Sequence, residues 1–170
     1  MVQRAGREDL SAVAELAALL WPDHTAGELA DIFWGIMSGG NAQFFLSCVR
    51  GVPIGFAQCQ LRLDYVEGTD SSPVGYLEGI FVREEYRRRG HAGELVSACE
   101  AWAQENGCRE FASDCEWAND ASRAFHLQVG FSEVGRIICF AKRLPQHEKS
   151  REESHDAKDL PGDRDSRSEG

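Results

Sequence analysis

The sequence predicts an α/β domain with a mixed, mostly antiparallel sheet that is flanked by helices. Apolar residues recur at helical spacing in several segments, and these segments alternate with short apolar runs bounded by turn residues. A turn at 50–53 joins two of the runs directly, whereas helices separate the later ones. Hairpins and helical crossovers together produce a sheet with both antiparallel and parallel pairs.

Two helices are expected in the first forty residues. Asp9 or Ser11 can cap the first helix, which keeps its apolar residues on one face as far as Leu20. Thr25 and Glu28 have the spacing of a capping box, which predicts the start of the second helix. A Gly-Gly pair is expected to end it.

The strands are expected where apolar runs lie between turn signals. The predicted strands are at 2–5, 43–50, 54–63, 75–82 and 109–114, with one or two more within 131–144. A long helix at 91–106 and a shorter one to Val129, capped by Asn119 or Asp120, separate the later strands. A glycine follows each of these helices, as is usual at a helix C-terminus.

Composition limits the class of protein. The 170 residues fit one domain, expected at 1–145, and 42% hydrophobic content is enough for a packed core. Residues 146–170 contain almost no large apolar side chain, which predicts a disordered acidic tail. Neither a membrane span nor a signal peptide is recognisable, so we expect a cytoplasmic protein. The acidic balance, with a net charge of -10, argues against a general nucleic-acid binder.

The six cysteines are expected to be reduced thiols, because none forms a C-x-x-C motif and most stand in apolar segments. Cys115 follows an aspartate and invites the idea of an acyl-cysteine intermediate. No histidine stands next to it, so the sequence disfavours covalent catalysis there. No spacing typical of metal ligands is present.

The most informative motif is the Arg-x-x-Gly-x-Ala stretch from Arg87 to Ala92, between an apolar strand and a helix. Gly90 removes a Cβ where the chain must turn tightly or let a ligand approach. The helix that follows directs its positive dipole end and its free backbone N–H groups to the same place. Three consecutive arginines stand here in an acidic chain. The motif therefore predicts a pyrophosphate site.

The strand, the arginine loop, the helices and a Gly-Phe pair at 130–131 together resemble the GCN5-related N-acetyltransferase (GNAT) superfamily, over roughly residues 1–144. The resemblance implies the acyl-CoA N-acyltransferase fold, with acetyl-CoA as co-substrate and no metal. It implies that acetyl-CoA is bound by the strand before the loop, by the loop itself and by one helix cap: Ile80, Phe81, Val82, Arg88, Arg89, Gly90, His91, Ala92, Gly93 and Asn119.

Three separated blocks, at 20–24, 64–82 and 107–114, carry a narrower resemblance to the aminoglycoside 6'-N-acetyltransferases of the antibiotic-resistance type. The resemblance implies direct transfer of an acetyl group to the 6'-amino group of an aminoglycoside within a ternary complex. It also implies a homodimer, to which the apolar segment 137–140 could contribute. The substrate contacts that it implies are Trp21, His24, Tyr65, Glu78 and Asp114.

The two carboxylates can also be interpreted from the residues alone. Glu78 interrupts an apolar strand, and strict alternation would place it on one face with Ile80 and Val82. It either forms a structural ion pair with an arginine, or binds the substrate ammonium and accepts its proton as the catalytic base. Asp114 ends the strand expected beside it, and is either a turn residue or a second substrate contact.

Further positions leave alternatives open. Trp21 and Tyr65 could cover sugar rings, although a Trp after a helix is as often a core residue. His126 stands where many superfamily members have a tyrosine that protonates the leaving thiolate, and it either takes that role or packs structurally. The resemblance also implies an acidic residue shortly after Gly-Phe, where this chain has Glu133 and then Gly135.

Two other functions are compatible with the arginine loop. One is acetyl transfer to another polyamine or to a protein amine, which would not require the four residues Trp21, His24, Tyr65 and Asp114 together. The other is acyl-CoA binding without turnover.

Overall fold

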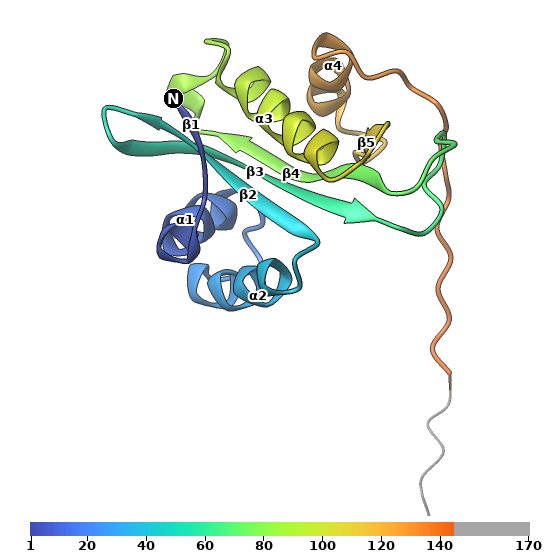
Figure 1. The fold of residues 1–170 in the computed structure, drawn as a ribbon, viewed down its shortest axis with the longest axis horizontal. Helices are drawn as coiled ribbons and strands as arrows, with labels where there is room; N and C mark the ends of the chain where they lie inside the picture. Colours follow the sequence, from blue (N-terminus) through green and yellow to red (C-terminus); the bar gives the residue numbers. More distant parts are fainter. Residues whose placement is uncertain (145–170) are drawn as a thin grey trace, which may run out of the picture. The chain divides into compact units, whose positions relative to one another are not determined.

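The computed structural model describes residues 1–144 (Figure 1). The chain divides into two units, Met1–Arg136 and Ile137–Gly170. The first unit holds every helix and strand of the described residues, and residues 137–144 of the second have no regular secondary structure. The tail predicted at 146–170 lies outside the described residues.

The first unit is built on a five-stranded sheet with the order β1-β2-β3-β4-β5. The first four strands pair antiparallel, and β5 lies parallel to β4. This confirms the mixed, mostly antiparallel sheet and its short first strand. The strands are β1 (Val2–Arg4), β2 (Ala42–Val49), β3 (Val52–Arg62), β4 (Val74–Val82) and β5 (Phe111–Ser113).

Helices cover both faces of the sheet (Figure 1). On one face lie α1 (Leu10–Leu20) and α2 (Ala26–Ser38), packed through a cluster that includes Phe33, Phe44 and Phe56. On the other face lie α3 (His91–Glu105) and α4 (Asp120–Gln128), over a second cluster that includes Ile54, Leu95 and Trp102. Two short 3-10 turns, η1 (Arg7–Asp9) and η2 (Glu84–Tyr86), precede α1 and α3.

Local sequence signals explain where the helices begin. In the capping box of α2, the Glu28 N–H donates to Thr25 Oγ1 at 3.3 Å and the Thr25 N–H donates to Glu28 Oε2 at 2.9 Å. Asp9 is the N-cap of α1, but its carboxylate accepts from the Gly6 N–H instead of capping the helix. Asn119 caps α4 as expected.

A β-bulge in β4 changes the facing of its residues. Gln58 pairs with Gly79 and the next residue, Cys59, pairs with Leu77, so Glu78 is the extra residue. Leu77 therefore packs in the same cluster as Ile80 and Val82, on the α3 side. Strict alternation, which put Glu78 with these two residues, is wrong because the bulge re-aims the chain at this point.

The strands expected within 131–144 are absent, so that expectation is wrong. Apolar residues recur there, but a strand forms only where its backbone N–H and C=O groups pair with a neighbour. Ile137, Ile138 and Phe140 are 73%, 83% and 93% exposed. β5 is also shorter than the predicted 109–114, since it begins only at Phe111.

All six cysteines carry free thiols, of which Cys59, Cys99 and Cys108 are buried. Of the helices in residues 1–144, none combines the length and the apolar character that crossing a bilayer requires.

Candidate active site

The arginine loop is a tight turn between β4 and α3. Arg88 and Gly90 both adopt left-handed backbone conformations, with φ of 58° and 89°. The Arg87 side chain turns back, and its Nε donates to the Val82 carbonyl at 2.9 Å. Arg88 and Arg89 are exposed beside the start of α3. The turn thus leaves two cationic side chains next to a helix N-terminus.

The first turn of α3 offers backbone donors at that place. Intrahelical bonding begins with the Glu94 N–H, which donates to the Gly90 carbonyl at 3.0 Å. The preceding amides, at His91, Ala92 and Gly93, are those that a helix leaves without an intrahelical acceptor. A Cβ built at Gly90 or Gly93 would meet no atom within 4 Å, so the backbone is uncovered. Donors, dipole and arginines together suit a pyrophosphate.

The His91 side chain itself is directed into the protein. Its Nδ1 lies 3.5 Å from Oγ of the buried Ser47 on β2, and the side chain is 16% exposed. Its ring also packs edge-on against Tyr86. The backbone N–H of His91, not its imidazole, is therefore the group that can bind a phosphate.

The edge of β4 continues toward this loop. β5 pairs only with Gly75, Tyr76 and Leu77, so β4 beyond Leu77 has no strand partner on that side among the described residues. Only alternate residues of β4 direct their backbone groups to this edge. The Arg83 N–H bonds to the Ile54 carbonyl, and Phe81 lies opposite Phe56 in the same ladder, so the groups of Phe81 face β3, contrary to the prediction. The backbone groups of Ile80 can pair with an extended ligand, while the Val82 carbonyl already accepts from Arg87.

Asn119 has a structural role at the start of α4. Its Oδ1 accepts from the Ser122 N–H at 3.0 Å, which caps the helix. The amide nitrogen of the same side chain is the group that remains for a ligand.

Glu78 is held by an arginine that the sequence analysis did not single out. Arg62, the last residue of β3, donates from Nε and Nη2 to Glu78 Oε1 at 3.1 and 2.9 Å, and from Nη2 to Oε2 at 3.0 Å. The Glu78 side chain is 23% exposed. The ion pair that was one of two alternatives is present, and it leaves the carboxylate accessible for binding a cation.

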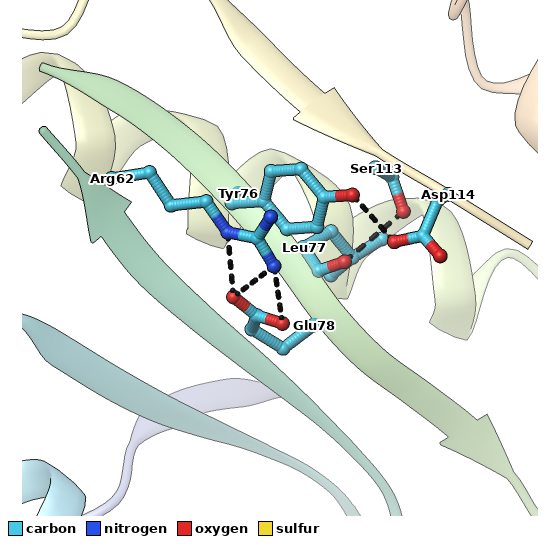
Figure 2. A network of polar contacts seen from close by, with 6 residues as sticks. All are labelled: Arg62, Tyr76, Leu77, Glu78, Ser113 and Asp114. Carbon is cyan, nitrogen blue, oxygen red and sulfur yellow. Dashed lines mark hydrogen bonds and ion pairs between the residues drawn. The ribbon is translucent and has the colours of Figure 1, made fainter. Parts of the chain in front are cut away.

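Asp114 is tied to the same network (Figure 2). The Tyr76 phenol donates to Asp114 Oδ1 at 2.5 Å, and the Arg62 guanidinium lies over the Tyr76 ring, 3.3 Å from its centroid. Burial and the hydrogen bond to Asp114 raise the pKa of Tyr76 well above its ordinary value, so the phenol stays a donor. The two carboxylates, which the sequence placed on neighbouring strands, are thus linked through Tyr76 and Arg62.

Trp21 packs against the core cluster on the α1–α2 side of the sheet and lies against Gly79 of β4. Its ring packs edge-on against Phe33 and Phe56, and a Cβ at Gly79 would be 2.7 Å from its Cη2. The absence of a side chain at Gly79, next to Glu78, is what lets the indole lie against β4. Trp21 is therefore a core residue that lies against β4 at Gly79, the residue after Glu78.

His24 and Tyr65 are exposed on loops, and Tyr65 is 79% exposed. The Tyr65 hydroxyl donates to Glu67 Oε2 at 2.8 Å. Glu67 in turn lies against Gly135, where a Cβ would be 3.3 Å from its Cγ. Among residues 1–144 neither His24 nor Tyr65 is hydrogen-bonded to the carboxylate network, so the structure does not by itself bring them into it.

His126 joins α4 to the sheet. Its Nδ1 lies 2.7 Å from the Ser122 carbonyl and its Nε2 lies 2.9 Å from Ser113 Oγ, which donates to the Leu77 carbonyl at 3.0 Å. The ring also packs edge-on against Phe131. Both ring nitrogens have protein partners, which agrees with the structural alternative.

Sequence reasoning missed Arg62, Tyr76 and Ser113. A signal for Arg62 was present, because Gln58, Gln60 and Arg62 alternate as polar residues along β3 and so share one face. Tyr76 and Ser113 look like ordinary strand residues, and only the parallel pairing of β4 with β5 brings them beside their partners. Residues 1–144 contain no group of His, Cys, Asp or Glu side chains that could hold a metal ion.

Comparison with known proteins agrees with this geometry. The chain matches the acetyltransferase (GNAT) family over residues 10–131. It is similar to an aminoglycoside N(6')-acetyltransferase type 1 of Salmonella typhimurium, at 41% identity over 143 residues, which cover 84% of this chain and 98% of the relative. A relative of the same name from Serratia marcescens is 37% identical, with 85% and 99% covered.

Solved structures give the same picture. The chain is similar to AAC(6')-Iy in complex with the bisubstrate analog CoA-S-monomethyl-acetylneamine, with a TM-score of 0.81, 38% identity and coverage of 85% of this chain and 98% of that chain. It is also similar to the aminoglycoside 6'-N-acetyltransferase AAC(6')-IG from Acinetobacter haemolyticus, with a TM-score of 0.80, 32% identity and coverage of 85% and 99%. The likeness extends over nearly the full length of both structures and confirms the predicted fold class.

Proposed function

The chain belongs to the acetyltransferase (GNAT) family, and we propose that it transfers the acetyl group of acetyl-CoA to the 6'-amino group of aminoglycoside antibiotics. The observation that carries this proposal is the identity of 41% over 98% of the length of a relative named for that reaction. The geometry supports it, because an anion-binding helix start and an open strand edge lie on one side of a network with two carboxylates. A polycationic amine and a pyrophosphate-bearing donor need such a two-sided site.

One set of protein groups binds acetyl-CoA. Acetyl-CoA, when bound, supplies an activated thioester. The amides of the first turn of α3, with Arg88 and Arg89, bind its pyrophosphate, and the β4 edge at Ile80 aligns its extended arm. The amide nitrogen of Asn119 is a further contact for it.

On the other side of the site, Glu78 binds the 6'-ammonium and accepts one proton, directly or through water. The amine nitrogen then attacks the thioester carbon, so that a C–N bond forms and the C–S bond breaks. The second amine proton leaves with the sulfur. Asp114 binds another ammonium of the drug, and Trp21, His24 and Tyr65 contact its rings.

Acetylation removes a positive charge from the drug. Phosphate contacts dominate the binding of cations to nucleic acid, so the acetylated drug binds ribosomal RNA more weakly. The reaction therefore confers resistance on the cell that contains the enzyme. Acetyl-CoA and ribosomes are both in the cytoplasm, which is where we infer that the reaction takes place.

The reaction is tested by measuring CoA release from acetyl-CoA with kanamycin, tobramycin or spermidine, and by the mass of the products. We expect one acetyl group on each drug and none on spermidine. An aminoglycoside with a hydroxyl in place of the 6'-amine is the matched control and should not react at that position. Preferred turnover of spermidine would indicate a general polyamine acetyltransferase, and CoA binding without any turnover would indicate a binding module.

We also propose that the protein is a homodimer. Ile137, Ile138 and Phe140 are mostly exposed to solvent, and a second copy of the chain would bury these apolar side chains. Sedimentation equilibrium should therefore give twice the mass of one chain for the wild type. The Phe140→Asp variant should give the mass of a single chain. Val52→Asp, at the exposed first residue of β3, is the control and should stay dimeric. A monomeric wild type would contradict the proposal.

A further inference from the structure

Arg62 is fixed from two directions at the end of β3. Its guanidinium edge makes three hydrogen bonds to the Glu78 carboxylate, at 2.9 to 3.1 Å. Its face lies on the Tyr76 ring, 3.3 Å from the centroid to Cζ. An arginine side chain loses rotamer freedom when it is held in this way, and a planar fork loses less of it per hydrogen bond than a lysine would. Arg62 is thus a preorganised support for one particular carboxylate.

Tyr76 extends the support to the neighbouring strand. Its ring carries the guanidinium, and its hydroxyl donates to Asp114 just beyond β5. Tyr76 pairs with Ala112 in the parallel β4–β5 ladder, so the phenol reaches Asp114 along a fixed strand register. The side chains of Arg62 and Tyr76 therefore connect Glu78 to Asp114 (Figure 2).

The hydrogen bonds of Arg62 are unevenly divided between the two carboxylate oxygens. Oε1 of Glu78 accepts two of them and Oε2 accepts one. Each carboxylate oxygen has two lone pairs, so one acceptor position remains on Oε2. Arg62 thereby selects which oxygen can meet an incoming ammonium.

Stability alone gives a weak reason for this arrangement. The Arg62 and Glu78 side chains are 40% and 23% exposed, and ion pairs that remain in contact with solvent contribute little to stability. Without Arg62, two carboxylates on adjacent strands would repel each other with no cation between them. The arrangement is better explained by the geometry that it imposes on the two acids.

We propose that Arg62 and Tyr76 are positioning residues, which hold Glu78 and Asp114 in one fixed arrangement that receives the ammonium groups of the amine substrate. The inference rests on the proposed function and adds two residues to it. Neither residue needs to touch the reacting atoms, because each acts through the carboxylate that it holds.

The test compares Arg62→Met, Arg62→Lys and Tyr76→Phe with the wild type. For each protein, kcat and KM for kanamycin, the Kd of CoA and the melting temperature are measured. We expect Arg62→Met to lower kcat/KM for kanamycin by about 10- to 100-fold, the scale of a misplaced reacting group, with the Kd of CoA within about 2-fold. Arg62→Lys should recover only part of the loss, because an ammonium cannot hold both oxygens. Tyr76→Phe should raise KM for kanamycin more than it lowers kcat.

Arg4→Met is the matched control, since Arg4 pairs with Glu105 from β1, at the opposite edge of the sheet. It should leave all kinetic constants unchanged. Wild-type kanamycin kinetics in Arg62→Met and Tyr76→Phe would overturn the proposal. So would a loss in which amine turnover, CoA binding and melting temperature fall together in every variant, because that pattern indicates a purely structural role.

The proposed function and this inference fail in different ways. A wild type that turns over no amine overturns the proposed function alone. Calorimetric binding of kanamycin then tests the inference without turnover, and equal affinity of the wild type and Arg62→Met would overturn it.

Discussion

The indole of Trp21 occupies the space that a side chain at residue 79 would fill. A Cβ on Gly79 would lie 2.7 and 2.8 Å from the Trp21 atoms Cη2 and Cζ2. Trp21 cannot retreat easily, because Phe33 and Phe56 pack against its ring with centroids at 6.2 and 5.9 Å. A glycine in the strand and a tryptophan after α1 are therefore a matched pair beside Glu78.

Gly79→Ala should displace the indole. We expect a loss of about 1–3 kcal/mol in the free energy of unfolding, as for other overpacked positions, and a higher KM for kanamycin. Urea denaturation and steady-state kinetics measure the two effects. Gly27→Ala on α2 is the control, since a Cβ there meets nothing within 4 Å. Unchanged stability and KM in Gly79→Ala would show that Trp21 moves freely.

Glu78→Gln should retain the fold and lose most of kcat. The glutamine oxygen can still accept from Arg62, but the side chain can no longer take a proton. We expect kcat to fall by about 10²- to 10⁴-fold, the usual contribution of a general base, with the melting temperature nearly unchanged. Near-wild-type turnover in this variant would remove Glu78 from the mechanism.

Gly90→Ala should weaken acetyl-CoA binding. Gly90 has a φ of 89°, and a Cβ there meets no atom, so the cost is conformational and not steric. An L-residue in this conformation costs about 1–2 kcal/mol, which the loop can relieve only by turning its amides away. KM for acetyl-CoA should rise while KM for kanamycin stays constant. Equal increases in both constants would contradict a role confined to the pyrophosphate side.

His126→Ala should destabilise the protein more than it slows the reaction. The substitution removes the bonds to Ser122 and Ser113 and the packing of the ring against Phe131. We expect a loss of about 1–3 kcal/mol in stability and a change in kcat of less than about 10-fold. A large fall in kcat at unchanged stability would instead assign the proton of the leaving thiolate to His126.

Glu110 should make the loop at 64–73 sensitive to acid. Hydrogen bonds from the Ser71 hydroxyl and from the backbone of Asp70 and Ser71 lower the pKa of Glu110 below its usual 4.5. A lowered folded pKa means that its stabilising effect is complete above about pH 4.5 and is lost as the pH falls through the folded value. Limited proteolysis of residues 64–73 should therefore accelerate below that pH in the wild type. In Glu110→Gln the loop should be cleaved faster already at neutral pH, and equal cleavage of both proteins at pH 7 would contradict this role.

The local signals of this chain were enough to predict most of its first unit. Thr25 with Glu28, the arginine loop with its glycine, and Asn119 are short patterns whose physics acts over three or four residues. The same is true of the antiparallel hairpin between β2 and β3, whose turn at Arg50 and Gly51 has positive φ at both positions. Each of these features is decided by neighbours in the sequence.

The carboxylate site could be predicted only in part, for a physical reason. Glu78 and Asp114 could be proposed as a pair, because they interrupt or end apolar strands that were expected side by side, and a family resemblance supported both. The bulge that changes the direction of the Glu78 side chain depends on the register between β3 and β4. That register cannot be predicted from the sequence of one strand. The cation that holds it, Arg62, comes from sixteen residues earlier in the chain.

The fold class, the arginine loop that we propose for the pyrophosphate and the two acids could thus be predicted from the chain and its family resemblance, because helix caps, turns and charge are local properties. The links of Arg62 and Tyr76 to those acids, the inward direction of the His91 imidazole and the absence of a strand at 131–144 became evident only from the folded chain. These outcomes depend on which backbones pair and in which register, and pairing is an interaction between distant segments. The parallel pairing of β4 with β5 brings Tyr76 within hydrogen-bonding distance of Asp114, and this contact connects the two carboxylates.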